Sequence, residues 1–248
     1  MELYHHDKNF TVKYCEVDFK DQLKPSTTLS FLEEVACSSA DELGFGYAYV
    51  KPRGVAFMVT NVACSFIKPI KLGEEITVRT WPTPPTHVVF GREYQIYATG
   101  GELLANASSR WCAVDIQTGK LVQSKFFSEQ DYSTYNPTRA LEIVRWKLPV
   151  FEKSEGELRF SLTIANSEYD HNMHVNNTRY ADYCFNVFSI EELSSLQVKT
   201  FAFSYLKQCK EGDLLQFYRK QTGENLWSVQ GYNGDLLVVQ AEIGFERL

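Results

Sequence analysis

The chain contains an internal repeat, and no other feature of the sequence constrains its fold as strongly. Residues 63–78 (ACSFIKPIKLGEEITV) align without gaps to residues 202–217 (AFSYLKQCKEGDLLQF), with five identical positions. A second match, residues 101–105 (GELLA) against 234–238 (GDLLV), follows in the same order. A common hairpin turn would explain the first match alone, whereas two ordered matches favour a tandem duplication. The 248 residues are therefore expected to form two similar units.

Both halves show the same predicted order of elements: a strand, a helix and then four strands. Hydrophobic periodicity and turn residues predict first strands over 10–18 and 158–166, and helices over 26–43 and from about 176 onward. The later strands are expected at 54–69, 74–82, 87–99 and 102–116, and again at 198–209, 213–221, 225–232 and 235–246. Because only a curling sheet covers a single long helix, this order predicts an α+β fold, a double hotdog.

The predicted organisation has two domains joined by a linker. We expect an N-terminal hotdog over 1–118, a linker over 119–155 and a C-terminal hotdog over 156–248. Gly119, Pro137 and Pro149 interrupt regular structure in the linker, which leaves room for a short helix within 137–146.

Composition and charge exclude several classes of protein. The chain carries 25 basic and 31 acidic residues without a basic cluster, so no nucleic-acid partner is expected. No apolar segment is long enough to span a membrane, and the first residues (MELYHHDKNF) lack the pattern of a signal peptide. The six cysteines are dispersed without a CxxC pair, which argues against disulfides and zinc. We therefore expect a cytoplasmic protein with no metal, no cofactor and no membrane partner.

A polar loop before the second helix is the strongest candidate for a functional site. Residues 168–177 (EYDHNMHVNN) place Asp170, Asn172 and His174 at alternate positions. The matching loop of the first half, residues 19–26 (FKDQLKPS), contains neither His nor Asn. A duplication in which only one copy keeps such a set is what an enzyme with one active site would show.

These residue types suit hydrolytic chemistry beside a helix N-terminus, which can polarise a carbonyl or hold an oxyanion. Asp170 can take a proton from water or attack directly, and His174 can transfer protons near neutral pH. Asn172 can orient a substrate carbonyl, the carboxylate or the water. The alternative is an Asx-rich loop that caps the helix, and for Asn176 and Asn177 capping is the favoured interpretation.

A second candidate lies in the repeated strand, where Gln208 and Cys209 replace Pro69 and Ile70 of the first copy. Cys209 can act as a thiolate nucleophile if His174 lies close. The alternative is a buried strand cysteine that behaves as a small apolar residue. For direct attack we favour this second interpretation.

Several motifs resemble those of the acyl-acyl carrier protein (acyl-ACP) thioesterases, over nearly the whole chain. Residues 169–183 (YDHNMHVNNTRYADY) resemble the family's D-x-N-x-H-V-N-N-x-x-Y signature, and residues 205–209 (YLKQC) its later Y-R-R-E-C. Residues 79–82 (RTWP) and 92–94 (REY) resemble its T-W-x and R-[DE]-[FWY] strands. The resemblance implies a double hotdog enzyme that hydrolyses the thioester between a fatty acyl chain and the phosphopantetheine of acyl carrier protein. Free fatty acid would be released and chain elongation ended, with the first domain lining the acyl-chain pocket.

The resemblance also implies roles for individual residues. Catalytic roles fall on Asp170, Asn172, His174, Gln208 and Cys209, and substrate contacts on Trp81, Asn176, Asn177 and Tyr180. One departure is Gln208, where plant members of the family have Glu. A neutral amide cannot act as a general base, so either Asp170 or His174 activates the water or Gln208 only orients it; we expect the latter.

Three other functions are compatible with parts of the sequence. An acyl-CoA thioesterase would share the chemistry and differ in the carrier. An acidic carrier protein should dock on basic residues, for which the candidates are Arg139, Arg145, Lys147, Arg179, Lys207 and Lys210.

A hotdog hydratase or dehydratase would resemble G-D-x-N-P-x-H, whereas this chain has Tyr169 before Asp170 and no proline in the loop. A non-catalytic acyl-binding protein would be expected to lose the polar loop. Self-association into a homodimer stays open.

Overall fold

Two units make up the computed structural model, which describes residues 3–127, 129, 132, 134–142 and 144–248. Unit 1 comprises Met1–Leu23 and Thr28–Val144, and unit 2 comprises Lys24–Thr27 and Arg145–Leu248. The division falls inside the predicted linker of residues 119–155, whose exact bounds stay a prediction.

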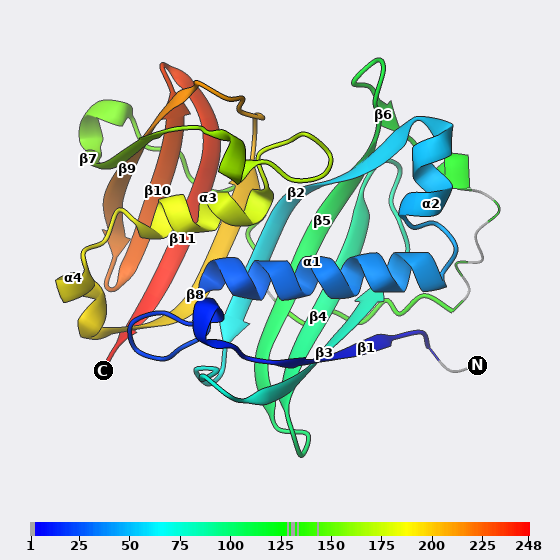
Figure 1. The fold of residues 1–248 in the computed structure, drawn as a ribbon, viewed down its shortest axis with the longest axis horizontal. Helices are drawn as coiled ribbons and strands as arrows, with labels where there is room; N and C mark the ends of the chain where they lie inside the picture. Colours follow the sequence, from blue (N-terminus) through cyan, green and yellow to red (C-terminus); the bar gives the residue numbers. More distant parts are fainter. Residues whose placement is uncertain (1–2, 128, 130–131, 133, 143) are drawn as a thin grey trace. The chain divides into compact units, whose positions relative to one another are not determined.

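Unit 1 is an antiparallel sheet with one long helix, α1 (Pro25–Glu42), across one face (Figure 1). The hydrogen-bonded strand order is β1-β3-β4-β5-β2, and β6 pairs with β5. The strands are β1 (His6–Thr11), β2 (Val55–Phe66), β3 (Glu75–Pro82), β4 (Phe90–Ala98), β5 (Leu103–Asp115) and β6 (Leu121–Val122). A short helix, α2 (Tyr47–Val50), precedes β2. The inner side chains of α1 are buried, and the Phe31 ring stacks on Phe10 of β1 at 4.3 Å between centroids. Apolar burial between α1 and the sheet therefore forms the core of unit 1.

Unit 2 repeats this arrangement with the shorter helix α3 (Asn177–Phe185) across its sheet (Figure 1). Its strand order is β8-β11-β10-β9-β7. The strands are β7 (Glu157–Thr163), β8 (Leu196–Tyr205), β9 (Leu214–Gly223), β10 (Leu226–Asn233) and β11 (Leu236–Arg247), and α4 (Ile190–Ser194) precedes β8. In both units the strand before the long helix pairs with the second strand after it, and the first strand after it pairs with the fourth. The duplication predicted from sequence is thus present in the strand order.

The repeated glycines have a conformational reason. Gly73 and Gly212 occupy equivalent turns before β3 and β9, with φ of 79° and 86°. This left-handed region is open to glycine at little cost, whereas a side chain is strained there. The turn therefore explains why a glycine stands at this position in both copies.

The first strand and the linker differ from the sequence-based expectation. A strand was expected over 10–18, but β1 is His6–Thr11 and residues 14–16 form a 3-10 turn. Pairing ends there because β3 begins at Glu75, and the next backbone bond joins Val12 N–H to the Glu74 carbonyl at 2.9 Å. No helix is assigned to residues 137–142 or 144–146, so the short helix considered there is not formed in the described part of the linker.

Buried polar side chains hold the linker on the outer face of each sheet. In unit 1, Glu93 is fully buried and accepts hydrogen bonds from Arg139 Nη1 at 2.7 Å and from the Ala140 backbone N–H at 3.0 Å. In unit 2, the buried Gln230 faces the backbone of Phe151. Each satisfied polar group fixes an extended segment that has no regular structure of its own.

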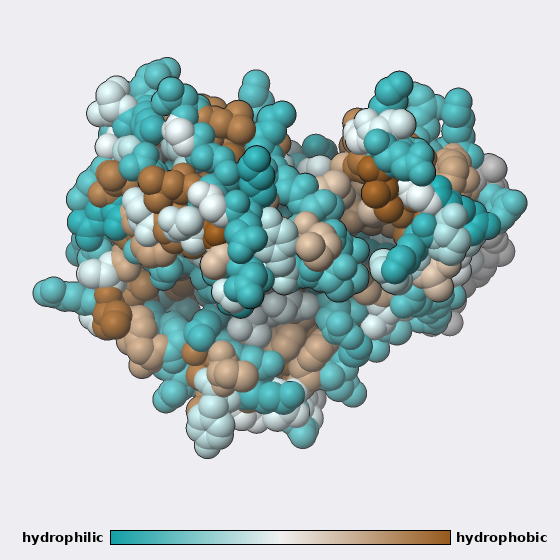
Figure 2. Space-filling view, turned by 45° about the horizontal axis from the view of Figure 1, so that its top comes forward, coloured by the Kyte–Doolittle hydropathy of each residue, from teal (hydrophilic) through white to brown (hydrophobic). Residues whose placement is uncertain are grey.

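Within the described residues, no helix combines the length and hydrophobicity needed to cross a bilayer. On the face drawn in Figure 2, hydrophilic side chains prevail and hydrophobic residues gather only in small groups. This face offers no broad apolar surface.

Candidate functional site

The polar loop of unit 2 is a tight hairpin between β7 and α3. Tyr169 and Val175 pair as an antiparallel bridge, and the Asp170 N–H donates to the His174 carbonyl at 2.8 Å. Met173 at the turn has φ of 60°, in the left-handed region that a non-glycine residue rarely adopts. Such strain is common where a loop presents functional side chains.

Asp170 organises this hairpin through its side chain. Its Oδ1 accepts the backbone N–H of Asn172 at 2.8 Å and that of His174 at 3.2 Å. Within the described residues its Oδ2 accepts no hydrogen bond, so one oxygen holds the loop and the other is available to a substrate or water. The side chain is only partly buried, which keeps it within reach of both.

The hairpin pairs the backbones of Asp170 and His174, and the catalytic roles expected for both residues stay a prediction. Residues opposite each other in an antiparallel pair project their side chains to the same side, with Cβ atoms about 5 Å apart. His174 is partly buried, whereas Asn172 at the tip is exposed. The backbone pairing therefore sets Asp170 and His174 at opposite positions of the hairpin, with Asn172 in the loop between them.

Asn176 caps α3, which confirms the capping interpretation for this residue. Its Oδ1 accepts hydrogen bonds from the Thr178 backbone N–H and hydroxyl, both at 2.8 Å. Asn177 is the first residue of the helix. Because the cap occupies the Thr178 N–H, that donor is not free to hold an oxyanion.

Gln208 and Cys209 lie in the turn after β8, beside the polar loop. The Tyr169 hydroxyl accepts the backbone N–H of Glu211 in this turn at 2.7 Å, which links the two segments. Gln208 is exposed, whereas Cys209 is 3% exposed and lies next to the hydroxyl of Tyr180 from α3. Burial raises the pKa of the Cys209 thiol, and the Tyr180 hydroxyl offsets only part of this effect. The thiol is therefore protonated near neutral pH, where a nucleophilic cysteine would need a lowered pKa.

Two buried tyrosine hydroxyls stand out beside Cys209. Tyr180 and Tyr183, one helical turn apart on α3, are 4% and 5% exposed, and neither hydroxyl has a well-formed hydrogen bond among the described residues. Tyr183 also packs edge-on against Phe217 at 5.8 Å. The apolar stripe of the helix includes both tyrosines, but the sequence alone does not show that Tyr183 is a candidate site residue, because that depends on the unsatisfied hydroxyl.

Trp81 lies in unit 1, on β3, and is buried. Its indole N–H donates to the Thr138 carbonyl of the linker at 2.9 Å. The indole nitrogen is thus already engaged, and its contact with substrate stays a prediction.

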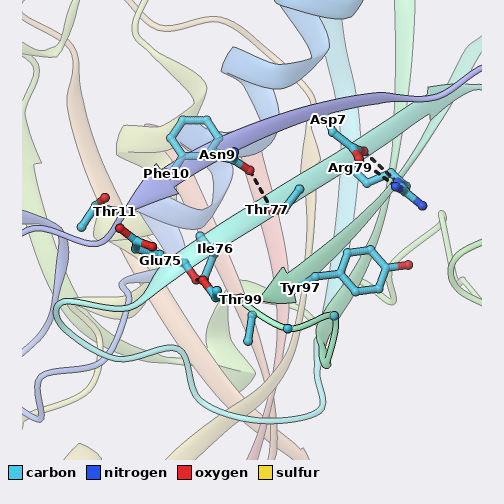
Figure 3. A pocket seen from close by; sticks show the side chains of 13 residues that line it. Asp7, Asn9, Phe10, Thr11, Glu75, Ile76, Thr77, Arg79, Tyr97 and Thr99 are labelled. Carbon is cyan, nitrogen blue, oxygen red and sulfur yellow. Dashed lines mark hydrogen bonds and ion pairs between the residues drawn. The ribbon is translucent and has the colours of Figure 1, made fainter.

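A pocket of about 650 Å³ opens on unit 1 over β1, β3 and β4 (Figure 3). Asp7 and Arg79 form a two-pronged ion pair on its wall, and the Thr77 hydroxyl donates to Asn9. The pocket is lined by none of the predicted site residues, so its size alone does not make it the catalytic centre.

The candidate docking residues differ in how they are engaged. Arg139 is bound to Glu93, and Arg145 Nη1 lies 3.9 Å from the Glu242 carboxylate. Four candidates are exposed and form no ion pair among the described residues: Lys147, Arg179, Lys207 and Lys210. Lys207 and Lys210 flank Gln208 and Cys209 directly. Positive charge is therefore available beside the candidate site.

Comparison with known proteins adds independent information. The acyl-ACP thioesterase N-terminal domain model matches residues 3–145, and the C-terminal domain model matches residues 152–242. The oleoyl-acyl carrier protein thioesterase 1 of Arabidopsis thaliana is 21% identical over 92% of this chain, which spans 66% of that relative's length.

Two solved structures share the fold over almost the whole chain. An acyl-ACP thioesterase from Bacteroides thetaiotaomicron superimposes with a TM-score of 0.89 at 22% identity, covering 98% of each chain. The 12:0-ACP thioesterase from Umbellularia californica gives the same TM-score at 17% identity, again covering 98% of each chain. The predicted double hotdog is thereby confirmed. Since family models match both halves and together span nearly all of its residues, the chain belongs to the acyl-ACP thioesterase family.

Proposed function

We propose that this protein hydrolyses the thioester bond of fatty acyl-ACP, releasing a free fatty acid and ending chain elongation. The observation that carries the proposal is the hairpin that sets Asp170 opposite His174 at the start of α3, in a chain whose two halves both match the family. Unit 2 would supply the catalytic residues and unit 1 the pocket for the acyl chain. The six cysteines are free, which fits a reducing compartment such as the cytoplasm.

The proposed reaction begins with attack of water on the thioester carbonyl. Asp170 takes the proton from water through its free Oδ2, while Oδ1 stays bound to the loop backbone. The tetrahedral oxyanion then collapses, the carbon–sulfur bond breaks, and the departing phosphopantetheine sulfur takes a proton from His174. Asn172 orients the carbonyl, and Gln208 orients the water without acting as a base.

Cys209 has a packing role in this scheme rather than a nucleophilic one. Its thiol is buried and its pKa is raised, so little thiolate forms near neutral pH. Water attack needs no cysteinyl intermediate. The small thiol instead packs against the side chain of Tyr180. We propose that Tyr180 also contacts the substrate.

The experiment compares one acyl chain on two carriers. Purified protein is given the acyl group on acyl carrier protein and on coenzyme A, and the released acid is measured. A higher kcat/KM for acyl-ACP supports the proposal; preference for acyl-CoA makes the protein an acyl-CoA thioesterase, and no release from either contradicts hydrolysis altogether.

Carrier docking can be tested separately on the exposed lysines beside the site. Lys207→Glu and Lys210→Glu should raise KM for acyl-ACP several-fold and leave KM for acyl-CoA nearly unchanged, because an acidic carrier is attracted by local positive charge. Lys125→Glu is the control, because Lys125 is exposed, lies in unit 1 and is not a docking candidate. Equal effects on both substrates would exclude a carrier-specific role. Light scattering on the same preparation would show whether the protein forms a homodimer, which the sequence leaves open.

A further inference from the structure

Unit 1 buries a guanidinium group that contacts no carboxylate among the described residues. Arg92 on β4 is 6% exposed, and its Nη1 donates to the hydroxyls of Ser39 on α1 at 2.8 Å and Thr80 on β3 at 3.3 Å. Within the described residues it forms no ion pair. Burying a charge without an opposite charge is costly, so such a group is expected to have a reason to be there.

The other edge of the Arg92 guanidinium is open. Neither Nε nor Nη2 makes a hydrogen bond to the described residues. In Arg79 the same two atoms donate hydrogen bonds to the two carboxylate oxygens of Asp7, at 2.7 Å each (Figure 3). In Arg219 they bind Glu157 at 3.2 Å and Glu192 at 2.7 Å. This chain therefore pairs that edge with carboxylates in two other arginines, whereas no described residue pairs with it in Arg92.

The open edge is not sealed inside the protein. Arg219 Nη1 is fully enclosed and has no hydrogen-bond partner in the described part of the chain. Nε and Nη2 of Arg92 also lack partners among these residues, but they are not fully enclosed. Two parallel N–H donors that keep some accessible surface match the two oxygens of a carboxylate.

Apolar side chains continue from Arg92 along the inner face of the sheet. Phe90 lies two residues before Arg92 on β4, and alternate residues of a strand face the same side. Its ring contacts Phe57 at 5.2 Å and Phe127 at 5.4 Å between centroids. Phe127 is 1% exposed and belongs to a hydrophobic cluster with Val50 and Ala113. An anion bound to Arg92 would thus have hydrocarbon surroundings on this side.

We propose that Arg92 anchors a carboxylate-binding site inside unit 1, and that its ligand is an aliphatic carboxylate. The two carboxylate oxygens accept from Nε and Nη2, and the chain packs toward the cluster of Phe57, Phe90 and Phe127. The carboxylate can come from a released fatty acid or from the distal end of an acyl chain that carries a second acid group. The site is distinct from the Asp170 loop, so its test does not depend on hydrolysis.

The first test uses the unaltered protein and two ligands of equal length. Binding of decanoate and of decanol is measured by isothermal titration calorimetry at a pH where decanoate is ionised. A carboxylate site predicts at least about tenfold tighter binding of decanoate. Equal affinities, or no binding of either ligand, would overturn the proposal and leave Arg92 a structural residue.

Substitutions show whether Arg92 causes the tighter binding of decanoate. Arg92→Gln removes the charge and the paired Nε and Nη2 donors (the fork of the guanidinium), so the preference for decanoate over decanol should disappear. Arg79→Gln is the matched control, because its fork is already filled by Asp7 and the preference should stay unchanged. If circular dichroism shows that Arg92→Gln does not fold, Arg92→Lys keeps the charge without the fork and should lose most of the preference. Retention of the full preference in a folded Arg92 variant contradicts the assignment.

Kinetic arms then separate the two sources of the carboxylate. If the ligand is the released acid, decanoate should inhibit acyl-ACP hydrolysis more strongly in the unaltered protein than in Arg92→Gln. If the ligand is a distal acid group, a dicarboxylic acyl thioester should be hydrolysed faster than the plain chain of equal length, and only while Arg92 is present. Either result supports the site, and the measurement that depends on Arg92 shows whether the bound carboxylate is the released acid or a distal acid group.

Discussion

The carboxylate of Asp170 accepts the backbone N–H of His174 at 3.2 Å, across a hairpin in which the His174 carbonyl accepts the Asp170 N–H at 2.8 Å. The same side chain therefore shapes the loop and offers its second oxygen to the proposed reaction. The two roles can be separated, because an amide keeps the accepting oxygen and loses the base.

Asp170→Asn should abolish turnover and preserve the fold. The amide oxygen still accepts from Asn172 and His174, but it cannot take a proton, so kcat should fall by about 10²–10⁴-fold. Asp170→Ala should lose activity and also about 1 kcal/mol of stability, since the loop N–H groups lose their acceptor. Steady-state kinetics and urea unfolding measure the two effects. Substantial activity in a folded Asp170→Asn protein would refute the assignment of Asp170 as the base.

Cys209→Ala should keep kcat within about tenfold of the unaltered enzyme, because water rather than the thiol attacks. Removal of a true nucleophile typically costs about 10⁶-fold. Single-turnover kinetics with quenched-flow mass spectrometry should also show no acyl group on the protein. An acyl-cysteine adduct, or a loss approaching that of a nucleophile, would restore Cys209 to a covalent role.

Glu93→Gln should destabilise unit 1 by about 2 kcal/mol, because a fully buried carboxylate satisfies Arg139, Ser108 and the Ala140 N–H together. An amide would set its NH2 group against one of these donors. Arg139→Gln is the comparison, and it should cost less than about 1 kcal/mol since the arginine side chain is 55% exposed. Chemical unfolding of both variants measures the difference. A larger loss in Arg139→Gln would contradict this account of the linker anchor.

Glu192→Gln should lower stability at neutral pH and have less effect in acid. Hydrogen bonding to the buried Arg219 at 2.7 Å lowers the pKa of Glu192 to about 2, from an ordinary value of 4.5. A lowered pKa in the folded state adds stability above pH 4.5, and this stability is lost as the pH falls toward 2. The side chain is 35% exposed, so the effect at neutral pH should be no more than about 1 kcal/mol. Unfolding curves of both proteins over this pH range should converge at the acid end; a constant difference would contradict the assignment.

Much of the fold could be predicted from local patterns. The helix expected over 26–43 is α1, Pro25–Glu42, because its apolar spacing and terminal residues lie within a few turns of chain. The eight strands expected after the two helices are all present, with ends that differ by a few residues. The strand expected over 10–18 ends at Thr11, because its length depends on where the distant strand β3 begins.

The candidate site shows the same division between local and distant information. Alternating Asp170, Asn172 and His174 before a helix could be recognised in ten residues of sequence, and the capping role of Asn176 follows from its own dihedral angles and its neighbour Thr178. The sequence favours a buried Cys209 over a nucleophilic one, and its 3% exposure confirms the burial, but the neighbouring Tyr180 hydroxyl is visible only in the structure. The unsatisfied hydroxyl of Tyr183 and the anchoring of the linker by Glu93 likewise involve partners far along the chain.

Three properties could be predicted from the sequence alone: the chain is a duplication, each half is one helix with an antiparallel sheet, and only the second half carries the polar loop. These properties reside in periodicity, turn residues and motifs, all of which are local. Three further properties follow only from the folded chain: among the described residues, Asp170 keeps one unpaired oxygen and Arg92 keeps Nε and Nη2 unpaired, and burial keeps the Cys209 thiol protonated. Burial, pKa and hydrogen-bond satisfaction are set by whatever surrounds a group in space, and in this fold most of those neighbours come from distant strands and helices.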